Sequence, residues 1–587
     1  MLKSTTVSAC IGPISTENEN WQCCGPGDLA SREPGLIGLD RPGRSLWSMA
    51  MTKVPIKDGV VSSPYPPIEL PRDESFYQYV RRRFLERPHQ PALVRSGERL
   101  RFADVLSLME RYANGFRRHG VSCGSRVCVN VSNSAESFVA AYSLCCLGAA
   151  VVLVKPSLPE REVLHLVEDS QVGYILTEQQ NAGKILNVHR KYKFKTLFSI
   201  DHAQGFVCVR DFEEENGEFH EPQIEDTRNH ITLYIYTSGT TGLPKGVEVS
   251  VFAYNTSVEL CRAAKLFEEG DVVLAWNPVP HISGFVFCMA AFICGATVVP
   301  SQGGLSPKEF VDIINTHKVT SLCAFPTAFR QLVFQLKEGL VPSLKRIVMC
   351  GTNSTEDLYQ RTLKVFQLES LRNGYGMSEG FGFLTMTPTN TIGYRSAGVA
   401  LPLVEYKIID NTTGQHLGPG EVGEIIFRSP HVMRGYHNRP DATAQVLDEQ
   451  GWCSSGDAGY YDSYGNLYIA ERIKDMIKCM DQQVAPAEIE TILNQHPLVR
   501  EAAVVGIDHP ELGEAPTAFV VVEPSARGQV SEEELVQLVA EQMVFYKNLH
   551  GGVIFVDHIP TTDTGKYQRN KLRQEHSCHL KKQCSNT

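Results

Sequence analysis

The stretch "YTSGTTGLPKGVE", residues 236–248, directly follows the apolar run "ITLYI" at 231–235. It combines hydroxyl side chains and glycines with one lysine, Lys245, which stands between Pro244 and Gly246. Glycine lets backbone N–H groups approach an anion closely, hydroxyls add hydrogen-bond donors, and lysine adds positive charge. A loop of this composition after a strand predicts a phosphate-binding site rather than a plain surface turn.

The same loop differs from the phosphate-binding loop of Walker-type NTPases. In that motif the lysine is followed by serine or threonine and enters a helix. Here Gly246 follows Lys245, and the proline before the lysine disfavours helical backbone at this point. A phosphate site outside the Walker class is therefore expected.

Composition and charge are those of an ordinary globular protein, with 42% apolar and 21% charged residues among 587. This length predicts more than one domain. The formal net charge is −10 and no polybasic run occurs, so nucleic acid and anionic membrane surfaces are not expected as partners. The 17 cysteines are odd in number and none forms a C-x-x-C pair, which predicts reduced, buried thiols in a reducing compartment.

Two apolar runs, 139–154 and 285–300, are each about 16 residues long, shorter than the roughly 20 residues that a membrane-spanning helix needs. Gly148 and Gly295 divide them, so each run is predicted to be a buried helix that leads into a strand. No transmembrane segment is expected. The first 50 residues lack the apolar centre of a secretory signal and the chain does not end in S-K-L, so we expect a cytoplasmic protein.

Apolar runs and helical patterns alternate from about residue 65, which predicts an α/β fold of layered sheets with packed helices. The expected strands are 231–239, 297–301, 321–327 and 346–351, and the expected helices are 307–317 and 327–339. Beyond residue 474, short β runs and a helix that begins after Ser531 predict a separate small α+β domain. We expect a disordered extension over 1–64, a large domain over 65–473, a small C-terminal domain over 474–575 and a tail over 576–587.

Further segments follow the loop along the chain. They are "NGYGMSEG" (373–380), "GWCSSGDAGYYD" (451–462), "ERIKDMIK" (471–478) and "PTTDTGKYQR" (560–569). With the loop, and in this order, they resemble the motifs of the adenylate-forming superfamily, which includes acyl-CoA synthetases, 4-coumarate–CoA ligases and beetle luciferases. The resemblance covers about residues 65–575. It implies a large AMP-binding domain and a small C-terminal domain that moves between two half-reactions.

The function that this resemblance implies is ATP-dependent activation of an apolar carboxylic acid. The acid is joined to AMP with release of pyrophosphate, and the acyl group then passes to CoA. The implied ligands are a small-molecule carboxylic acid, ATP, Mg²⁺ and CoA. Two alternatives remain open: a luciferase-like monooxygenase that oxidises the adenylate, and a nucleotide-binding homologue with an impaired CoA step.

The resemblance also implies a nucleotide site. Its triphosphate-binding residues would be Thr237, Ser238, Gly239, Thr240, Thr241, Gly242 and Lys245. Its adenine and α-phosphate segment would be Gly374, Tyr375, Gly376 and Ser378, and its ribose contacts would be Asp457 and Arg472. Glu379, together with Thr241, would hold Mg²⁺, an ion that prefers hard oxygen ligands.

The catalytic residues implied in the same way are Lys566 beside the forming acyl–phosphate bond, Lys478 at the second step and His281 near the carboxylate. A structural histidine is the competing interpretation for His281. Lys474 would be the hinge. The acid pocket would include Gly351, Thr352 and Met377, and Phe285, Phe287, Phe381 and Phe383 would make it apolar unless they pack in the core.

The sequence departs from the family pattern at two places. Asp481 stands where a glycine is usual after Lys478, which predicts a less efficient CoA step. Thr352 and Asn353 replace small residues in "CGTNS" (350–354), which predicts a narrower or more polar acid pocket.

Overall fold

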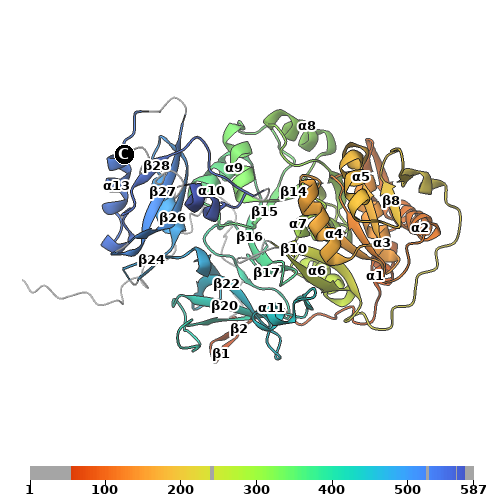
Figure 1. Cartoon of the computed structure of the whole chain (residues 1–587), viewed down its shortest axis with the longest axis horizontal. Coiled ribbons are helices and arrows are strands. Elements are labelled where there is room, and N and C mark those ends of the chain that lie inside the picture. Colours follow the sequence, from red (N-terminus) through yellow and green to blue (C-terminus); the bar gives the residue numbers. More distant parts are fainter. Residues whose placement is uncertain are drawn as a thin grey trace, which may run out of the picture. The chain divides into compact units, whose positions relative to one another are not determined.

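The computed structural model describes residues 54–237, 244–389, 391–480, 482–509, 511–523, 528–562 and 565–575, with the side chains of Lys474 and Gln483 left out. Four sheets carry this part of the chain (Figure 1). Two of them are largely parallel and hold most of the helices, one is antiparallel, and one belongs to the C-terminal part. The predicted α/β class is confirmed.

The nine-stranded sheet carries the predicted segment 373–380 at the carboxyl end of one of its strands. Its order is β18 (Val399–Ala400), β17 (Gly382–Met386), β16 (Ser370–Met377), β15 (Arg346–Cys350), β14 (Ser321–Ala324), β12 (Val272–Ala275), β13 (Thr297–Pro300), β3 (Pro91–Arg95) and β4 (Glu98–Arg101). From β13 to β16 the neighbours are parallel. Helices α8 (Pro307–His317), α9 (Pro326–Gln335) and α10 (Glu356–Val365) connect successive strands. Parallel strands place their carboxyl ends at one edge, where ligands of α/β proteins bind.

The eight-stranded sheet contains the two strands that flank the glycine-rich loop. Its order is β21 (Gly435–Tyr436), β11 (Lys245–Ser250), β10 (Ile231–Thr237), β6 (Ala150–Leu153), β5 (Arg126–Val129), β7 (Tyr174–Thr177), β8 (Thr196–Ser199) and β9 (Val207–Cys208). The strands from β10 to β9 are parallel, whereas β11 runs antiparallel to β10. The loop 238–243 between β10 and β11 lies outside the described residues.

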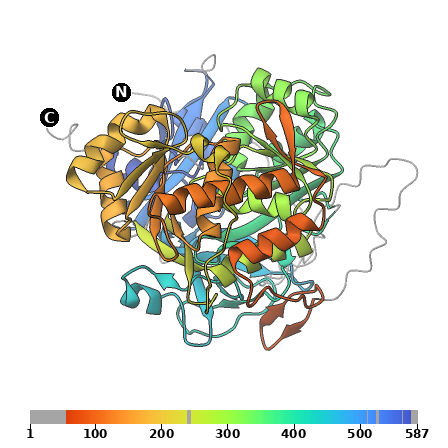
Figure 2. The same ribbon diagram turned by 90° about the vertical axis from the view of Figure 1, so that its right-hand side faces the viewer.

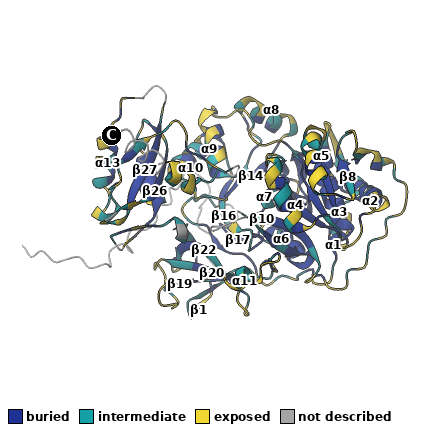
Figure 3. Cartoon of the chain, in the orientation of Figure 1, coloured by how far each residue is buried: buried dark blue, intermediate teal, exposed yellow. Residues whose placement is uncertain are grey.

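Helices pack on these two sheets with their apolar faces inward. They include α1 (Phe76–Leu85), α2 (Phe102–Arg118), α3 (Ala135–Cys146), α4 (Glu160–Ser170), α5 (Ala182–Lys191), α6 (Val251–Ala263) and α7 (Ile282–Ile293). Both apolar runs form the expected helix and strand, as α3 with β6 and α7 with β13, and these two helices are almost wholly buried. The orange-red pair α1 and α2 lies side by side (Figure 2). Figure 3 shows β10 and β14 as buried and the outer faces of α5 and α10 as exposed.

An antiparallel six-stranded sheet follows along the chain. Its order is β1 (Ile56–Lys57), β2 (Val60–Ser62), β19 (Glu405–Ile409), β20 (Gly423–Arg428), β22 (Trp452–Tyr461) and β23 (Leu467–Arg472), and the short helix α11 (Pro440–Ala444) precedes β22. The expected start of ordered structure at residue 65 is wrong for 54–64, because Val61 pairs with Tyr406 and is fully buried. The rest of the expected extension, residues 1–53, and the tail 576–587 lie outside the described residues.

The C-terminal part has a sheet and cores of its own. Its strands are β25 (Gln482–Val484), β24 (Ile477–Cys479), β27 (Gly513–Val522), β26 (Val499–His509) and β28 (Val553–Phe555), with helices α12 (Pro486–Leu493) and α13 (Glu532–Ala540). Ser531 caps α13, since its hydroxyl accepts from the Glu534 N–H at 3.1 Å. The predicted small α+β unit is thus present, and the change of sheet falls between Arg472 and Ile477, close to the predicted boundary at 474.

The cysteines agree with the expectation of buried thiols, and the helices agree with the expectation of no transmembrane segment. Twelve cysteines belong to the described residues, all of them free thiols, and eleven of these are buried. Every helix among the described residues is too short or too polar to cross a bilayer.

Candidate active site

The carboxyl edge of the nine-stranded sheet brings several predicted residues together. His281 caps α7 beyond β12, and its ring centre lies 5.6 Å from that of Phe325, which follows β14. Gly351 follows β15 with φ +92°, and a Cβ there would lie 2.8 Å from a ring atom of Phe325. Segments far apart in sequence therefore meet at the edge where the topology predicts a ligand.

The predicted adenine and ribose segments are joined by one hydrogen bond, beside an ion pair. The Tyr375 hydroxyl donates to Asp457 Oδ2 at 2.8 Å, and Arg472 Nε lies 3.5 Å from Asp457 Oδ1. The register of β22 and β23 sets Asp457 directly opposite Arg472. Burial, and then the Asp457 carboxylate, raises the pKa of Tyr375 well above its usual value, so the phenol stays protonated and donating.

Two glycines of this segment are required by close packing. A Cβ at Gly374 would lie 2.4 Å from a ring atom of Phe383, and one at Gly376 would lie 1.8 Å from the Gly382 carbonyl oxygen. Met377 ends β16, and the Ser378 carbonyl accepts from the Phe381 N–H at 3.1 Å in the turn that carries Glu379. The turn is thereby held at the end of the strand.

At the phosphate loop, Thr237 ends β10 and pairs with Lys245 at the start of β11. The predicted residues Ser238, Gly239, Thr240, Thr241 and Gly242 lie outside the described residues. Lys245 Nζ lies 5.0 Å from the ring centre of Tyr436, and the Tyr436 hydroxyl donates to Glu379 Oε1 at 2.8 Å. One tyrosine thus links the predicted phosphate lysine to the predicted metal ligand.

Tyr436 was not among the sequence-predicted residues. It lies on β21, which pairs with β11, and its neighbour His437 places Nδ1 2.7 Å from Glu248 Oε1. Burial and the Glu379 carboxylate raise the pKa of Tyr436, so its proton stays on the oxygen. The only signal was the polar and aromatic run "RGYHN" at 434–438.

The Lys566 turn faces the same edge of the nine-stranded sheet. The Lys566 N–H donates to Thr562 Oγ1 at 3.1 Å, and a Cβ at Gly565 would lie 2.6 Å from Thr327 Cβ on the first turn of α9. Burial raises the pKa of the Cys350 thiol at the end of β15 to about 12, and the Lys566 charge opposes that rise. The C-terminal lysine therefore lies close to the strand end that precedes Gly351.

Three residues downstream, Arg569 forms a buried charge cluster that sequence reasoning missed. Arg569 Nη2 lies 3.4 Å from Glu471 Oε2, and Arg569 also bonds Glu490 and, at 2.8 Å, the Val504 carbonyl. Burial raises the pKa of Glu471 to about 7, although the Arg569 charge acts in the opposite direction. The cluster connects the end of β23 to α12 and to the Lys566 segment.

Other predicted residues lie apart from this constellation or are only partly described. Lys478 is exposed on β24, with its backbone N–H bonded to Glu514 Oε2 at 2.7 Å. Lys474 lies in a short 3₁₀ turn, Ile473–Asp475, and its side chain is not described; Asp481 lies outside the described residues. The Thr352 hydroxyl is buried, and no partner among the described residues reaches it.

All four phenylalanines of the expectation belong to the main hydrophobic core of the described residues. Phe285 and Phe381 are fully buried against Tyr254, which favours core packing, the alternative left open for these side chains. Phe287 stacks on Phe383 instead, with ring centres 4.8 Å apart.

Comparison with known proteins agrees with this geometry. Residues 80–437 match the family model "AMP-binding enzyme", and residues 488–566 match "AMP-binding enzyme C-terminal domain". A luciferin 4-monooxygenase of Photuris pensylvanica is 31% identical, covering 83% of this chain and 91% of that protein. 4-Coumarate–CoA ligase 5 of Oryza sativa subsp. japonica is 30% identical, and the match covers 88% of this chain and 97% of that protein.

Among solved structures, o-succinylbenzoate CoA synthetase (MenE) of Bacillus subtilis, in complex with the acyl-adenylate intermediate OSB-AMP, superposes with a TM-score of 0.72. It is 28% identical and covers 84% of this chain and 97% of that one. Motif order, fold and both domain matches lead to one assignment. The chain belongs to the adenylate-forming superfamily of AMP-binding enzymes.

Proposed function

We propose that this adenylate-forming enzyme is an acid–thiol ligase: it activates a carboxylic acid with ATP and then transfers the acyl group to CoA. The observation that carries the proposal is the position of Lys566, whose turn packs on Thr327 and whose charge reaches Cys350 at the strand end beside the nucleotide motifs. A cation at that edge suits the first half-reaction. The relatives named as CoA ligases support the second.

In the first half-reaction, a carboxylate oxygen attacks the α-phosphorus of ATP, and the bond from that phosphorus to the pyrophosphate oxygen breaks. Negative charge develops on the α-phosphoryl oxygens as the bond to the acid forms. The Lys566 ammonium would neutralise that charge, and Lys245 would hold the departing pyrophosphate. Preorganised charge of this kind is typically worth about 10² to 10³ in rate.

The nucleotide itself would be held by the Tyr375, Asp457 and Arg472 group. The Asp457 carboxylate is 7% exposed and accepts from Tyr375, which leaves it oriented to accept from ribose hydroxyls as well. The ring of Tyr375 would stack on adenine. Because Arg472 faces Asp457 across the strands, its guanidinium would hold that carboxylate in place.

A magnesium ion fits the donor set at Glu379. This carboxylate is a hard oxygen ligand, and among the described residues only the Tyr436 hydroxyl bonds its side chain, at Oε1. When bound, Mg²⁺ would neutralise charge on the triphosphate. Thr241 would be a second ligand from the phosphate loop.

The contacts of His281 indicate which of its ring nitrogens carries the proton that a neighbouring carboxylate would accept. Its Nδ1 accepts from the Ser283 N–H at 3.2 Å, so in the neutral ring the proton is assigned to Nε2. An Nε2–H group can donate to the acid's carboxylate and hold it for attack. For the second half-reaction, rotation at Lys474 would bring Lys478 to the adenylate while the CoA thiol attacks the acyl carbon and AMP leaves.

The test is an assay of pyrophosphate and AMP release over a panel of carboxylic acids, with and without CoA. We expect acid-dependent pyrophosphate release, with AMP formed at a steady rate only when CoA is present. Acid-dependent pyrophosphate release that CoA never accelerates would overturn the ligase proposal. In the same assay, Asp481→Gly should speed the CoA step if the aspartate slows it, and an unchanged rate would reject that role.

A second candidate is a monooxygenase acting on the adenylate, which the similarity to luciferin 4-monooxygenase favours. It shares the first half-reaction and then consumes oxygen instead of CoA. Acid-dependent oxygen uptake or light in the absence of CoA would establish it, and neither is expected from the ligase.

A further inference from the structure

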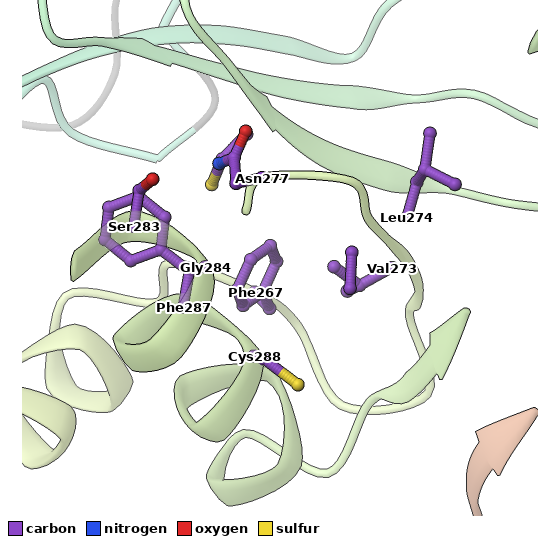
Figure 4. A pocket seen from close by; sticks show the side chains of 10 residues that line it. Phe267, Val273, Leu274, Asn277, Ser283, Gly284, Phe287 and Cys288 are labelled. Carbon is purple, nitrogen blue, oxygen red and sulfur yellow. The ribbon is translucent and has the colours of Figure 1, made fainter. Parts of the chain in front are cut away.

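A small cavity lies between α7, β12 and β14, with a volume of about 20 Å³ (Figure 4). One water occupies about 10–15 Å³ on this measure, so the cavity has room for one or two groups of that size. Its lining is Phe267, Val273, Leu274, Ala275, Asn277, Ser283, Gly284, Phe287, Cys288 and Cys323. Most of these side chains are apolar, and four of the ten residues come from α7, the helix that His281 caps.

The cavity adjoins the position proposed for the acid's carboxylate. Ser283 lines it, and the Ser283 hydroxyl lies 2.8 Å from His281 Nδ1. Gly284 lines it too, and a Cβ there would lie 1.9 Å from the Pro278 carbonyl oxygen, so the first turn of α7 packs tightly against the β12 loop. An acid held at Nε2, the other ring nitrogen of His281, would lie next to this turn of α7, and its carbon chain could enter the cavity.

One lining residue of the cavity, Phe287, is backed by a second phenylalanine. Phe287, which lines it, stacks on Phe383 with ring centres 4.8 Å apart and planes at 10°, and both rings are nearly buried. Phe383 is held in turn, because its ring fills the space over Gly374 and its carbonyl lies 3.1 Å from His431 Nε2. The wall is thus anchored on two elements, α7 and β17, and packed rings do not yield without cost.

One polar group in the lining also opposes a long alkyl chain. The Asn277 side chain is 9% exposed, and no hydrogen bond from the described residues reaches its amide. Figure 4 shows this amide among the side chains that line the cavity, near Ser283. An alkyl chain pressed against it would leave buried donors and an acceptor unpaired, which is costly.

We infer that the acid is short, of about two to four carbon atoms, and that the Phe287–Phe383 pair sets this limit. The inference rests on the proposed function, since it assumes that an acid is activated at this site. It narrows the expected apolar acid to a short one, and it assigns Phe287 and Phe383 as the residues that determine chain length.

The experiment measures kcat/KM for pyrophosphate release with straight-chain acids from acetate to decanoate, and with 4-coumarate, in the wild type and in Phe287→Ala. We expect the wild type to prefer acids of about two to four carbons over octanoate by at least tenfold, because one surplus methylene costs about 10-fold or more in a filled pocket. Phe287→Ala should raise the octanoate-to-propionate ratio at least tenfold.

The matched control is Phe292→Ala on the same helix, since Phe292 packs on Phe84 and Phe102 away from the cavity. It should leave the length preference unchanged. If Phe287→Ala does not fold, Phe287→Leu gives a smaller shift in the same direction. Octanoate or 4-coumarate preferred by the wild type would overturn the inference and leave the proposed function standing. Absence of pyrophosphate release with every acid would instead overturn the proposed function, and this inference with it.

Discussion

The Tyr436 hydroxyl donates a hydrogen bond to Glu379 Oε1 at 2.8 Å, while Lys245 Nζ lies 5.0 Å from the centre of the same ring. One side chain from β21 therefore orients a carboxylate on the nine-stranded sheet and a lysine on the eight-stranded sheet. A group that orients a metal ligand in this way typically contributes 10- to 100-fold in metal affinity. The two contacts can be separated, because phenylalanine keeps the ring and loses only the hydroxyl.

We expect Tyr436→Phe to raise the Mg²⁺ concentration for half-maximal pyrophosphate release about tenfold, with little change in KM for ATP. Tyr436→Leu, which also removes the ring beneath Lys245, should raise both. Titration of Mg²⁺ at saturating ATP, and of ATP at saturating Mg²⁺, distinguishes the two. Equal effects of the two variants on both constants would show that the ring has no role of its own beside the hydroxyl.

Asp457→Asn should weaken ATP binding. The substitution removes the charge that faces Arg472 and leaves a poorer acceptor for the Tyr375 hydroxyl. Hydrogen bonds to charged groups are worth about 1.5–3 kcal/mol, so KM for ATP should rise about 10- to 100-fold. Tyr375→Phe, which loses a single hydrogen bond and keeps the ring, should cost about fivefold. A larger effect from Tyr375→Phe than from Asp457→Asn would contradict this ranking.

The burial of Arg372 leads to a prediction about the free energy of unfolding. Arg372 is 3% exposed on β16, and its guanidinium donates to the carbonyls of Thr387, Lys265 and Ala264 at 2.7, 2.7 and 3.1 Å. An ammonium cannot reach all three, and each buried acceptor left unpaired costs about 1–3 kcal/mol. Arg372→Lys should therefore lower the free energy of unfolding by about 2–5 kcal/mol in urea titrations.

The control for that variant is Arg395→Lys, whose side chain is 64% exposed. In Arg395→Lys the free energy of unfolding should change by no more than about 0.5 kcal/mol. If both substitutions cost the same, the three carbonyl contacts of Arg372 do not determine its contribution. Because Arg372 precedes Tyr375 by three residues on the same strand, its variant should also raise KM for ATP.

The raised pKa of Glu471 predicts how the free energy of unfolding depends on pH. Its pKa in the folded chain is about 7, raised by burial against the pull of Arg569, with Glu490 and Asp475 adding to the rise. The folded state therefore binds a proton that the unfolded state has released between about pH 4.5 and 7, so the carboxyl destabilises the fold increasingly as pH rises through this window. At 1.36 kcal/mol per pKa unit, the full penalty above pH 7 is about 3 kcal/mol.

Glu471→Gln removes this penalty, so the variant should gain in Tm relative to the wild type as pH rises from 5 to 8. Arg569 keeps its bond to Glu490 in the variant, which limits the loss of charge pairing. Thermal unfolding at several pH values measures the gain. Glu511→Gln, at an exposed position of the same C-terminal part, should follow the wild-type curve. Parallel curves for Glu471→Gln and the wild type would contradict the buried titration.

Much of the fold could be predicted from apolar periodicity, and the places where that prediction fails have physical causes. The helices 307–317 and 326–335 agree with the expected segments, because their apolar faces repeat at helical spacing. β26 and β27 run for 11 and 10 residues, well beyond the apolar runs, since antiparallel backbones continue to pair whatever their side chains. β1 and β2 are too short for a periodic signal and depend on β19 for their pairing.

The candidate site likewise divides into residues that the sequence predicts and residues that it does not. Tyr375, Asp457, Arg472 and Lys566 stand in motifs whose order along the chain is informative. Tyr436 and Arg569 act through partners that are distant in sequence: Glu379 is 57 residues from Tyr436, and Glu471 is 98 residues from Arg569. Such pairs depend on sheet order and domain packing, which no local pattern contains.

Lys566→Ala should reduce acyl-adenylate formation by about 10² to 10³ while sparing thioester formation from a preformed acyl-adenylate. The reason is positional: Gly565 packs on Thr327, close to the strand that ends at Cys350, so the proposed role places the Lys566 ammonium where charge would develop in the first half-reaction. Pyrophosphate release measures the first step, and AMP release from added adenylate with CoA measures the second. Lys571→Ala, at an exposed position five residues on, controls for loss of a lysine and should change neither rate. If both half-reactions fall equally in Lys566→Ala, the lysine supports the fold of the C-terminal part rather than the chemistry, and adenylation must draw its cation from another side chain.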